Sequence, residues 1–179
     1  MAQLVIGIGD CKVSNDPADV LVTHALGSCI AVLLYDPVAR VAGLLHYMLP
    51  ESSLDPEKSG KLPFLFADTG ITLLLQNVLR LGAAKSRLVV VAAGGAEMLD
   101  TSRTFNIGHR NHIAMRKFFW KAGVIVHKEE IGGTSSRTVS IDVASGRVQL
   151  RMPGAPQREI IVNFRRNGGS DGLQHTHRR

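Results

Sequence analysis

The sequence is poor in cysteine and contains no long hydrophobic run. Its 179 residues include only Cys11 and Cys29, too few for a disulfide framework, so both are expected to be free thiols. No segment approaches the roughly 18 consecutive apolar residues of a membrane span. The N-terminus also lacks the basic start and the small-residue cleavage site of a secretory signal. These absences predict a cytoplasmic protein without membrane insertion.

Aromatic residues are also scarce, at 5%, although the net charge is +6, a sign typical of proteins that bind nucleic acid. About half of that excess lies in residues 165–179, where arginines alternate with Gly, Asn, Ser and His. Such a composition predicts a disordered basic C-terminal tail. The rest of the chain has neither a concentrated basic face nor stacking aromatic side chains, so no nucleic-acid partner is expected.

The chain length suits a single packed domain, which we expect over residues 1–164. Helical spacing of apolar residues predicts helices over 67–81 and 110–122, each followed by a glycine. The polar stretch 50–63 is expected to be a loop at the rim of a site. Apolar or alternating runs predict strands at 3–9, 20–23, 30–35, 41–48, 88–93, 124–128, 137–143, 147–151 and 159–164. The fold class is therefore α+β: a layered, mixed, sheet-rich core with two helices packed on one side.

A predicted β-hairpin carries the most informative pair of residues, Cys29 and His46. A turn at 36–39, with aspartate first and proline second, would place Tyr35 opposite Arg40. Counting back along both strands then puts Cys29 opposite His46 on one face of the sheet. A slip of two residues would keep both side chains on that face.

A thiol beside an imidazole suggests nucleophilic catalysis, in which Cys29 attacks and His46 accepts its proton. Gly27 and Ser28 precede the cysteine where the strand begins, so their region offers free backbone N–H groups for an oxyanion. The histidine is expected to lower the pKa of the thiol. The alternatives are an inert buried thiol for Cys29 and an ordinary core histidine for His46.

Other polar residues give weaker signals. Thr23 is a candidate for the third group that orients His46, or it is a plain strand threonine, and His24 is a rival base. Gly94 and Gly95 lack the spacing of a nucleotide loop, so they are assigned to a tight turn. The histidine pairs 109/112 and 175/177 have no further ligand at suitable spacing, and no metal is predicted.

The motifs at residues 23–29 (THALGSC) and 43–50 (GLLHYMLP) resemble those of the chemoreceptor glutamine deamidase family, CheD. The likeness continues through residues 94–96, 107–111 and 132–146, and covers about residues 3–164. Two positions depart from the family pattern, His24 and Ala25, and the arginine-rich tail is an addition.

This resemblance implies a fold related to toxin-type deamidases, with Cys29 as nucleophile, His46 as general base and Thr23 as third member. It implies a cofactor-free hydrolase that converts glutamines of methyl-accepting chemotaxis receptors to glutamates and releases ammonia, in chemotaxis adaptation. The implied partners are receptor cytoplasmic domains and a CheC-type phosphatase. Two rivals remain open: a binding module that uses Cys29 only for packing, and a cysteine hydrolase acting on another amide or ester.

Overall fold

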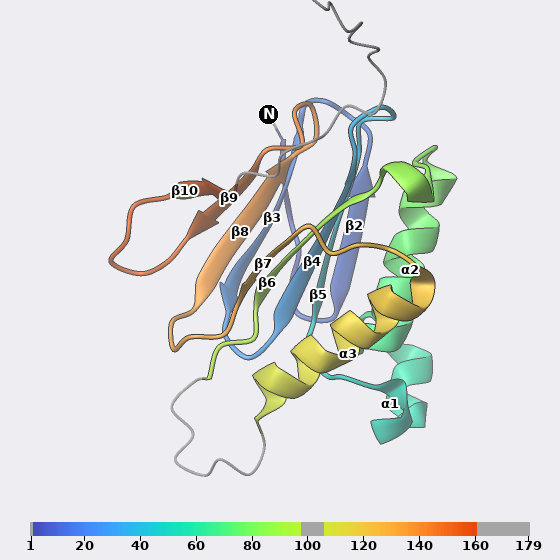
Figure 1. Ribbon diagram of the computed structural model, residues 1–179, viewed down its shortest axis with the longest axis vertical. Coiled ribbons are helices and arrows are strands. Elements are labelled where there is room, and N and C mark those ends of the chain that lie inside the picture. The colour runs from blue at the N-terminus through green and yellow to red at the C-terminus, as the bar shows by residue number, and fades with distance from the viewer. Residues whose placement is uncertain (1, 98–105, 161–179) are drawn as a thin grey trace, which may run out of the picture.

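Two five-stranded sheets pack face to face in the computed structural model, which describes residues 2–97 and 106–160 (Figure 1). The first sheet has the order β1-β3-β8-β9-β10 and the second has the order β2-β5-β4-β6-β7. Both are mixed, because β1/β3 and β6/β7 are parallel and the other pairs are antiparallel. This arrangement confirms the predicted α+β class.

The strands and helices have the following bounds. The first sheet contains β1 (Ala2–Val5), β3 (Asp19–Leu26), β8 (Arg137–Asp142), β9 (Val148–Arg151) and β10 (Arg158–Ile160). The second contains β2 (Asp10–Ser14), β4 (Ile30–Asp36), β5 (Val41–Tyr47), β6 (Val89–Gly94) and β7 (Lys128–Ile131). The helices are α1 (Pro56–Lys61), α2 (Ala67–Arg80) and α3 (Ile107–Ala122), with single 3-10 turns at Ser52–Leu54, Pro63–Leu65 and Lys85–Arg87.

The second sheet is covered on both faces, and this explains why its central strand β4 is entirely buried. Odd-numbered β4 residues such as Leu33 face the first sheet, whereas even-numbered residues such as Val32 face α2 and α3. Gly43 on β5 allows the close approach of α2, because a Cβ there would lie 2.7 Å from Leu74 Cδ1. The two longer helices thus lie on one side of the molecule, as predicted (Figure 1).

Several predicted boundaries differ from the structure. Residues 50–63 contain a 3-10 turn and the short helix α1 as well as loop. Strand β2 was not predicted, because its sequence DCKVS has few apolar residues. The strand expected at 124–128 begins only at Lys128, since Val124 instead packs beneath the C-terminus of α3 and donates to Phe119 O. Residues 161–164 of the last predicted strand and the predicted tail lie outside the described residues.

No helix within the described ranges has both the length and the apolar character needed to cross a membrane.

Candidate active site

The β4–β5 hairpin has a register that differs by two residues from the predicted one. Asp36 pairs with Val41, and the connecting loop is residues 37–40 rather than 36–39. Asp36 is the last residue of β4, and its buried carboxylate accepts from Arg87 and from the loop N–H groups of Val38 and Ala39. Ala31, and not Cys29, therefore lies opposite His46. The prediction of direct opposition was wrong.

Cys29 and His46 nevertheless face the same layer, because a shift of two residues preserves the alternation of a strand. Cys29 lies just before β4 and packs in the cluster between the two sheets with Ala31 and Leu33. His46 follows Ala42 and Leu44 on the same face of β5. Both residues are largely buried, with exposed fractions of 8% for Cys29 and 2% for His46.

Thr23 connects the two sheets at this point. Its Oγ1 lies 2.8 Å from His46 Nδ1 and 2.7 Å from Ile6 O. A threonine hydroxyl has one proton, and the Ile6 carbonyl can only accept, so that proton is directed to Ile6 O. His46 Nδ1 must then carry a hydrogen and donate it to Thr23 Oγ1. In the neutral imidazole this leaves the lone pair on Nε2.

His46 Nε2 is buried and has no hydrogen-bond partner among the described residues. Burial lowers the pKa of His46 from its ordinary 6.5 to about 4, because the imidazolium form would lose its hydration. The ring is therefore neutral near pH 7. A neutral histidine with a free Nε2 lone pair is in the state that a general base requires.

Burial also raises the pKa of the Cys29 thiol, and a hydrogen bond from the Cys29 backbone N–H only partly opposes this effect. The expectation that His46 would lower the thiol pKa therefore does not hold for the resting site, where desolvation is the larger effect. At neutral pH the pair consists of a thiol and a neutral imidazole. A thiolate at Cys29 would therefore need a base to accept its proton.

Three successive carbonyls in the loop before β4 are held from outside the loop. Ala96 N–H donates to Gly27 O over 2.8 Å, and Gly95 N–H donates to Cys29 O over 2.8 Å. The Asn111 side-chain amide donates to Ser28 O over 3.1 Å. No other residue within the described ranges accepts from the N–H groups of Ser28 and Cys29. These two donors are available for a developing oxyanion.

Gly94 and Gly95 make the approach to this loop possible. Their φ angles are +119° and +62°, a region that favours glycine. A Cβ on Gly94 would also collide with the carbonyl oxygen of Cys29. The tight turn assigned to this pair is not seen, because Gly94 is the last residue of β6 and Gly95 follows it without a turn.

Two buried polar residues at the site were missed in the sequence. Asn111 is fully buried on α3 and donates to Ser28 O and Met48 O. Arg137 on β8 donates to Gly94 O, at the end of β6, and to Gly132 O, just after β7, and so holds these two segments together. Asn111 lies on the buried face of α3 with Gly108, Met115 and Phe119. A polar side chain such as Asn111 on the apolar face of a predicted helix could have indicated a buried hydrogen-bonding role.

The weaker histidine candidates have other partners than Cys29 among the described residues. His24 is exposed, and its Nδ1 lies 3.4 Å from Thr138 Oγ1 in the first sheet. His109 and His112 line a cleft of about 360 Å³ beside β7, where His112 Nε2 lies 2.5 Å from Glu129 Oε2. Within the described ranges, no three His, Cys, Asp or Glu side chains are grouped to hold a metal ion. Residues 175 and 177 lie outside the described residues.

Comparison with known proteins agrees with the resemblance seen in the sequence. Residues 48–152 match the family described as CheD chemotactic sensory transduction. The chain is 47% identical over 170 residues to the probable chemoreceptor glutamine deamidase CheD of Solibacter usitatus, an alignment that covers 95% of this chain and 100% of the relative.

Two further relatives show the breadth of the similarity. The probable chemoreceptor glutamine deamidase CheD 1 of Syntrophus aciditrophicus is 48% identical over 160 residues, covering 89% of this chain and 100% of the relative. The probable chemoreceptor glutamine deamidase CheD of Pyrococcus horikoshii is 37% identical over 153 residues, an alignment that covers 84% of this chain and 93% of the relative. With a family match across more than half of the sequence and relatives aligned over most of it, this chain belongs to the CheD family.

Proposed function

We propose that this protein is a cysteine-dependent hydrolase that deamidates glutamine side chains of chemotaxis receptors to glutamates. The observation that carries the proposal is the hydrogen-bonded series Ile6 O, Thr23 Oγ1 and His46 Nδ1, which leaves a buried Nε2 lone pair on the face that Cys29 shares. The curated relatives supply the substrate class, since they are named probable chemoreceptor glutamine deamidases.

In the first half of the reaction, Cys29 Sγ attacks the carboxamide carbon of the glutamine while its proton moves to His46 Nε2. The carbonyl oxygen becomes an oxyanion and accepts from the N–H groups of Cys29 and Ser28, next to Gly27. The C–N bond then breaks, and the imidazolium returns its proton to the leaving nitrogen. Ammonia departs and a thioester remains.

In the second half, His46 Nε2 takes a proton from water, and the hydroxide attacks the thioester carbon. The C–S bond breaks, Cys29 Sγ regains the proton, and the receptor carries a glutamate. The net change is glutamine plus water to glutamate plus ammonia. Thiol, imidazole and water complete this cycle, so the proposal includes no cofactor.

The electrostatics of the site favour attack that is coupled to proton transfer. Burial raises the pKa of Cys29 and lowers that of His46, so a resting thiolate–imidazolium pair is disfavoured. Proton transfer to His46 becomes favourable when the negative charge moves from sulfur to the substrate oxygen, where the N–H donors and the imidazolium stabilise it. Such a site stabilises the transition state more than the resting state.

We assign this activity to residues 1–164 and place it in the cytoplasm, where the receptor signalling domains would be the partners. A CheC-type phosphatase is a further proposed partner. The binding-module alternative gives no reason for a buried histidine whose Nε2 has no partner, because that atom makes folding less favourable.

The decisive experiment measures ammonia release from receptor cytoplasmic fragments by wild-type protein and by Cys29→Ala. We expect release only with wild type, together with a mass increase of about 1 Da per converted glutamine in the receptor, as replacement of NH₂ by OH requires. Equal release by the two proteins would exclude Cys29 as nucleophile. No release from receptor fragments, with rapid alkylation of Cys29 by iodoacetamide, would favour a hydrolase with another substrate.

A further inference from the structure

The carbonyl of Ser28 and the N–H of Cys29 belong to one peptide unit, and this unit is held by a side chain from a distant helix. Asn111 Nδ2 donates to Ser28 O over 3.1 Å and to Met48 O over 2.8 Å. Both acceptors are carbonyls, so the amide orientation is unambiguous: only the NH₂ group can satisfy them. Asn111 thus joins the Cys29 loop to the end of β5, which carries His46.

We propose that Asn111 is a positioning residue that aims and polarises the oxyanion-binding N–H of Cys29. The described peptide bonds are all trans, so the C=O and the N–H of the Ser28–Cys29 unit point in opposite directions. Fixing the carbonyl by Asn111 therefore fixes the direction of the N–H. A hydrogen bond to the carbonyl also makes the N–H of the same unit a stronger donor.

The local contacts support this role. The Cys29 N–H is close enough to its own sulfur to favour the thiolate and so to lower the thiol pKa, against the larger effect of burial. The neighbouring carbonyls of Gly27 and Cys29 are held by backbone N–H groups of Ala96 and Gly95. Among the described residues, Ser28 is the only residue of this loop whose carbonyl accepts a hydrogen bond from a side chain.

The oxygen of the Asn111 side chain gives an independent reason to assign this residue a role other than stabilising the fold. Asn111 Oδ1 is buried and has no hydrogen-bond partner, and the same is true of His46 Nε2. No other buried side-chain nitrogen or oxygen in the described residues lacks a partner. An unsatisfied buried acceptor disfavours folding, so Asn111 is not the residue that packing alone would select. Both unsatisfied atoms lie in the same site.

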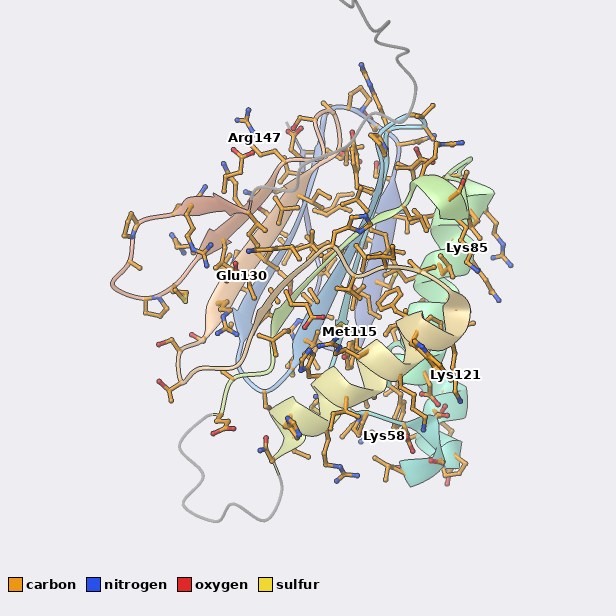
Figure 2. The ribbon with its side chains drawn as sticks, viewed as in Figure 1. Lys58, Lys85, Met115, Lys121, Glu130 and Arg147 are labelled. Carbon is orange, nitrogen blue, oxygen red and sulfur yellow. The ribbon has the colours of Figure 1, made fainter. Side chains whose placement is uncertain are left out.

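The inference rests on the proposed deamidation, and its test compares Asn111→Asp, Asn111→Ala and Met115→Ala with wild type. The Asp variant keeps the shape of the side chain and replaces the donor by oxygen. Met115 lies one turn further along the buried face of α3 (Figure 2) and contacts neither Ser28 nor Met48 by a hydrogen bond. It therefore controls for loosened packing of the helix.

Two activity readouts are expected to separate positioning from packing when all proteins are assayed below their melting temperatures. Both Asn111 variants are expected to lower kcat for ammonia release by about 10–100-fold, with KM within about threefold, because a misdirected N–H affects the transition state. Met115→Ala is expected to lower the melting temperature while kcat stays within about threefold of wild type.

A third readout follows the thiol directly. In a Cys11→Ser background, the pH at which iodoacetamide alkylates Cys29 half-maximally is expected to rise in the Asn111 variants, because the thiolate loses an aligned N–H. Met115→Ala should leave that pH unchanged. This readout needs no receptor, and each variant is alkylated below its melting temperature, because unfolding would expose the thiol and remove the effect of burial.

The positioning role is overturned if wild type is active and a folded Asn111→Asp keeps kcat within threefold. It is also overturned if Met115→Ala loses as much kcat as the Asn111 variants, or if the alkylation profile of the Asn111 variants matches that of wild type. Failure of the proposed function gives a different result: wild type itself then releases no ammonia from receptor fragments.

Discussion

The two ends of the β4–β5 hairpin bury polar groups in opposite ways. At the turn, the Asp36 carboxylate is fully buried and accepts hydrogen bonds from Arg87 and from three backbone N–H groups, those of Val38, Ala39 and Ala84. At the other end, His46 Nε2 and Asn111 Oδ1 are buried without partners. The carboxylate at the turn, the satisfied end, thus has a full set of partners, whereas two buried polar atoms at the other, unsatisfied end have none among the described residues.

The pKa values follow the same division. Burial by itself would raise the pKa of Asp36, but the hydrogen bonds from Arg87 and the backbone outweigh it and the pKa is lowered. For His46, burial lowers the pKa to about 4, and no opposite charge restores it. A buried charge with its full set of partners contributes to stability, whereas a buried base without a partner is in a reactive state.

The largest effect should come from the unsatisfied end, through Cys29→Ser. We expect deamidation to fall by at least about 10³-fold, because a serine hydroxyl is a much weaker nucleophile beside the same imidazole. The melting temperature should change little, since the two side chains have nearly the same shape. Steady-state ammonia release and thermal unfolding measure the two quantities. A Cys11→Ser variant is the matched control and should remain active.

Acid should destabilise the protein through His46. Its pKa is about 4 in the folded state and 6.5 when unperturbed, so the unfolded chain binds the proton more readily. Stability from this residue is therefore present above pH 6.5 and is lost as the pH falls from 6.5 to 4, by roughly 3 kcal/mol. Urea unfolding from pH 7 to 4 measures it.

The comparison variant for that experiment is His46→Gln, which should remove this part of the pH dependence. His24→Gln changes an exposed histidine and should retain the wild-type profile. Parallel pH profiles for wild type and His46→Gln would show that His46 is not buried in its neutral form.

At the satisfied end, Asp36→Ala should lower the free energy of unfolding by roughly 2–4 kcal/mol, because Arg87 and three N–H groups lose their acceptor. Below the melting temperature, kcat should stay within about threefold of wild type. Asp142→Ala is a control at the half-buried end of β8, where the carboxylate accepts, among the described residues, only from Ser145, and should cost about 1 kcal/mol or less. A large fall in kcat for a folded Asp36→Ala would contradict the separation between the two ends.

The smallest effect in free energy is expected from Thr23→Val, at about a tenfold loss of kcat, which corresponds to about 1.4 kcal/mol. Valine keeps the shape but removes the oxygen that accepts from His46 Nδ1, so the ring loses its preferred tautomer. Thr23→Ser retains the hydroxyl and should be nearly as active as wild type. Equal kcat values for the valine and serine variants would remove Thr23 from the site.

Local sequence patterns predicted most of the elements but not all of their bounds. The period of apolar residues in α2, and the glycine after it, predicted that helix to within one residue at each end. Strand β2 escaped notice because it is an edge strand with one well-buried residue, Ser14. Strand β7 was predicted to start at residue 124 but starts at Lys128. The apolar residue Val124 belongs to the core cluster on the helix side, and it does not pair with β6.

For the site, the sequence predicted that Cys29 and His46 share a face, but not their alignment. Alternation along a strand fixes the face, and it is insensitive to a shift of two residues. The alignment depends on Asp36, whose place in β4 is fixed by Arg87, 51 residues further along the chain. No local pattern contains that contact.

The sequence by itself indicated the class of chemistry that we propose, through a thiol and a histidine associated with the two strands of one hairpin, with Gly27 and Ser28 directly before the cysteine. These are properties of residue type and short-range periodicity. The tertiary structure alone decided which imidazole nitrogen is free and how the Cys29 loop is held. Both depend on hydrogen bonds between segments far apart in the chain: Thr23 from the opposite sheet bonds His46, and Asn111 from α3 bonds Ser28. Such contacts exist only once the sheets and helices have packed.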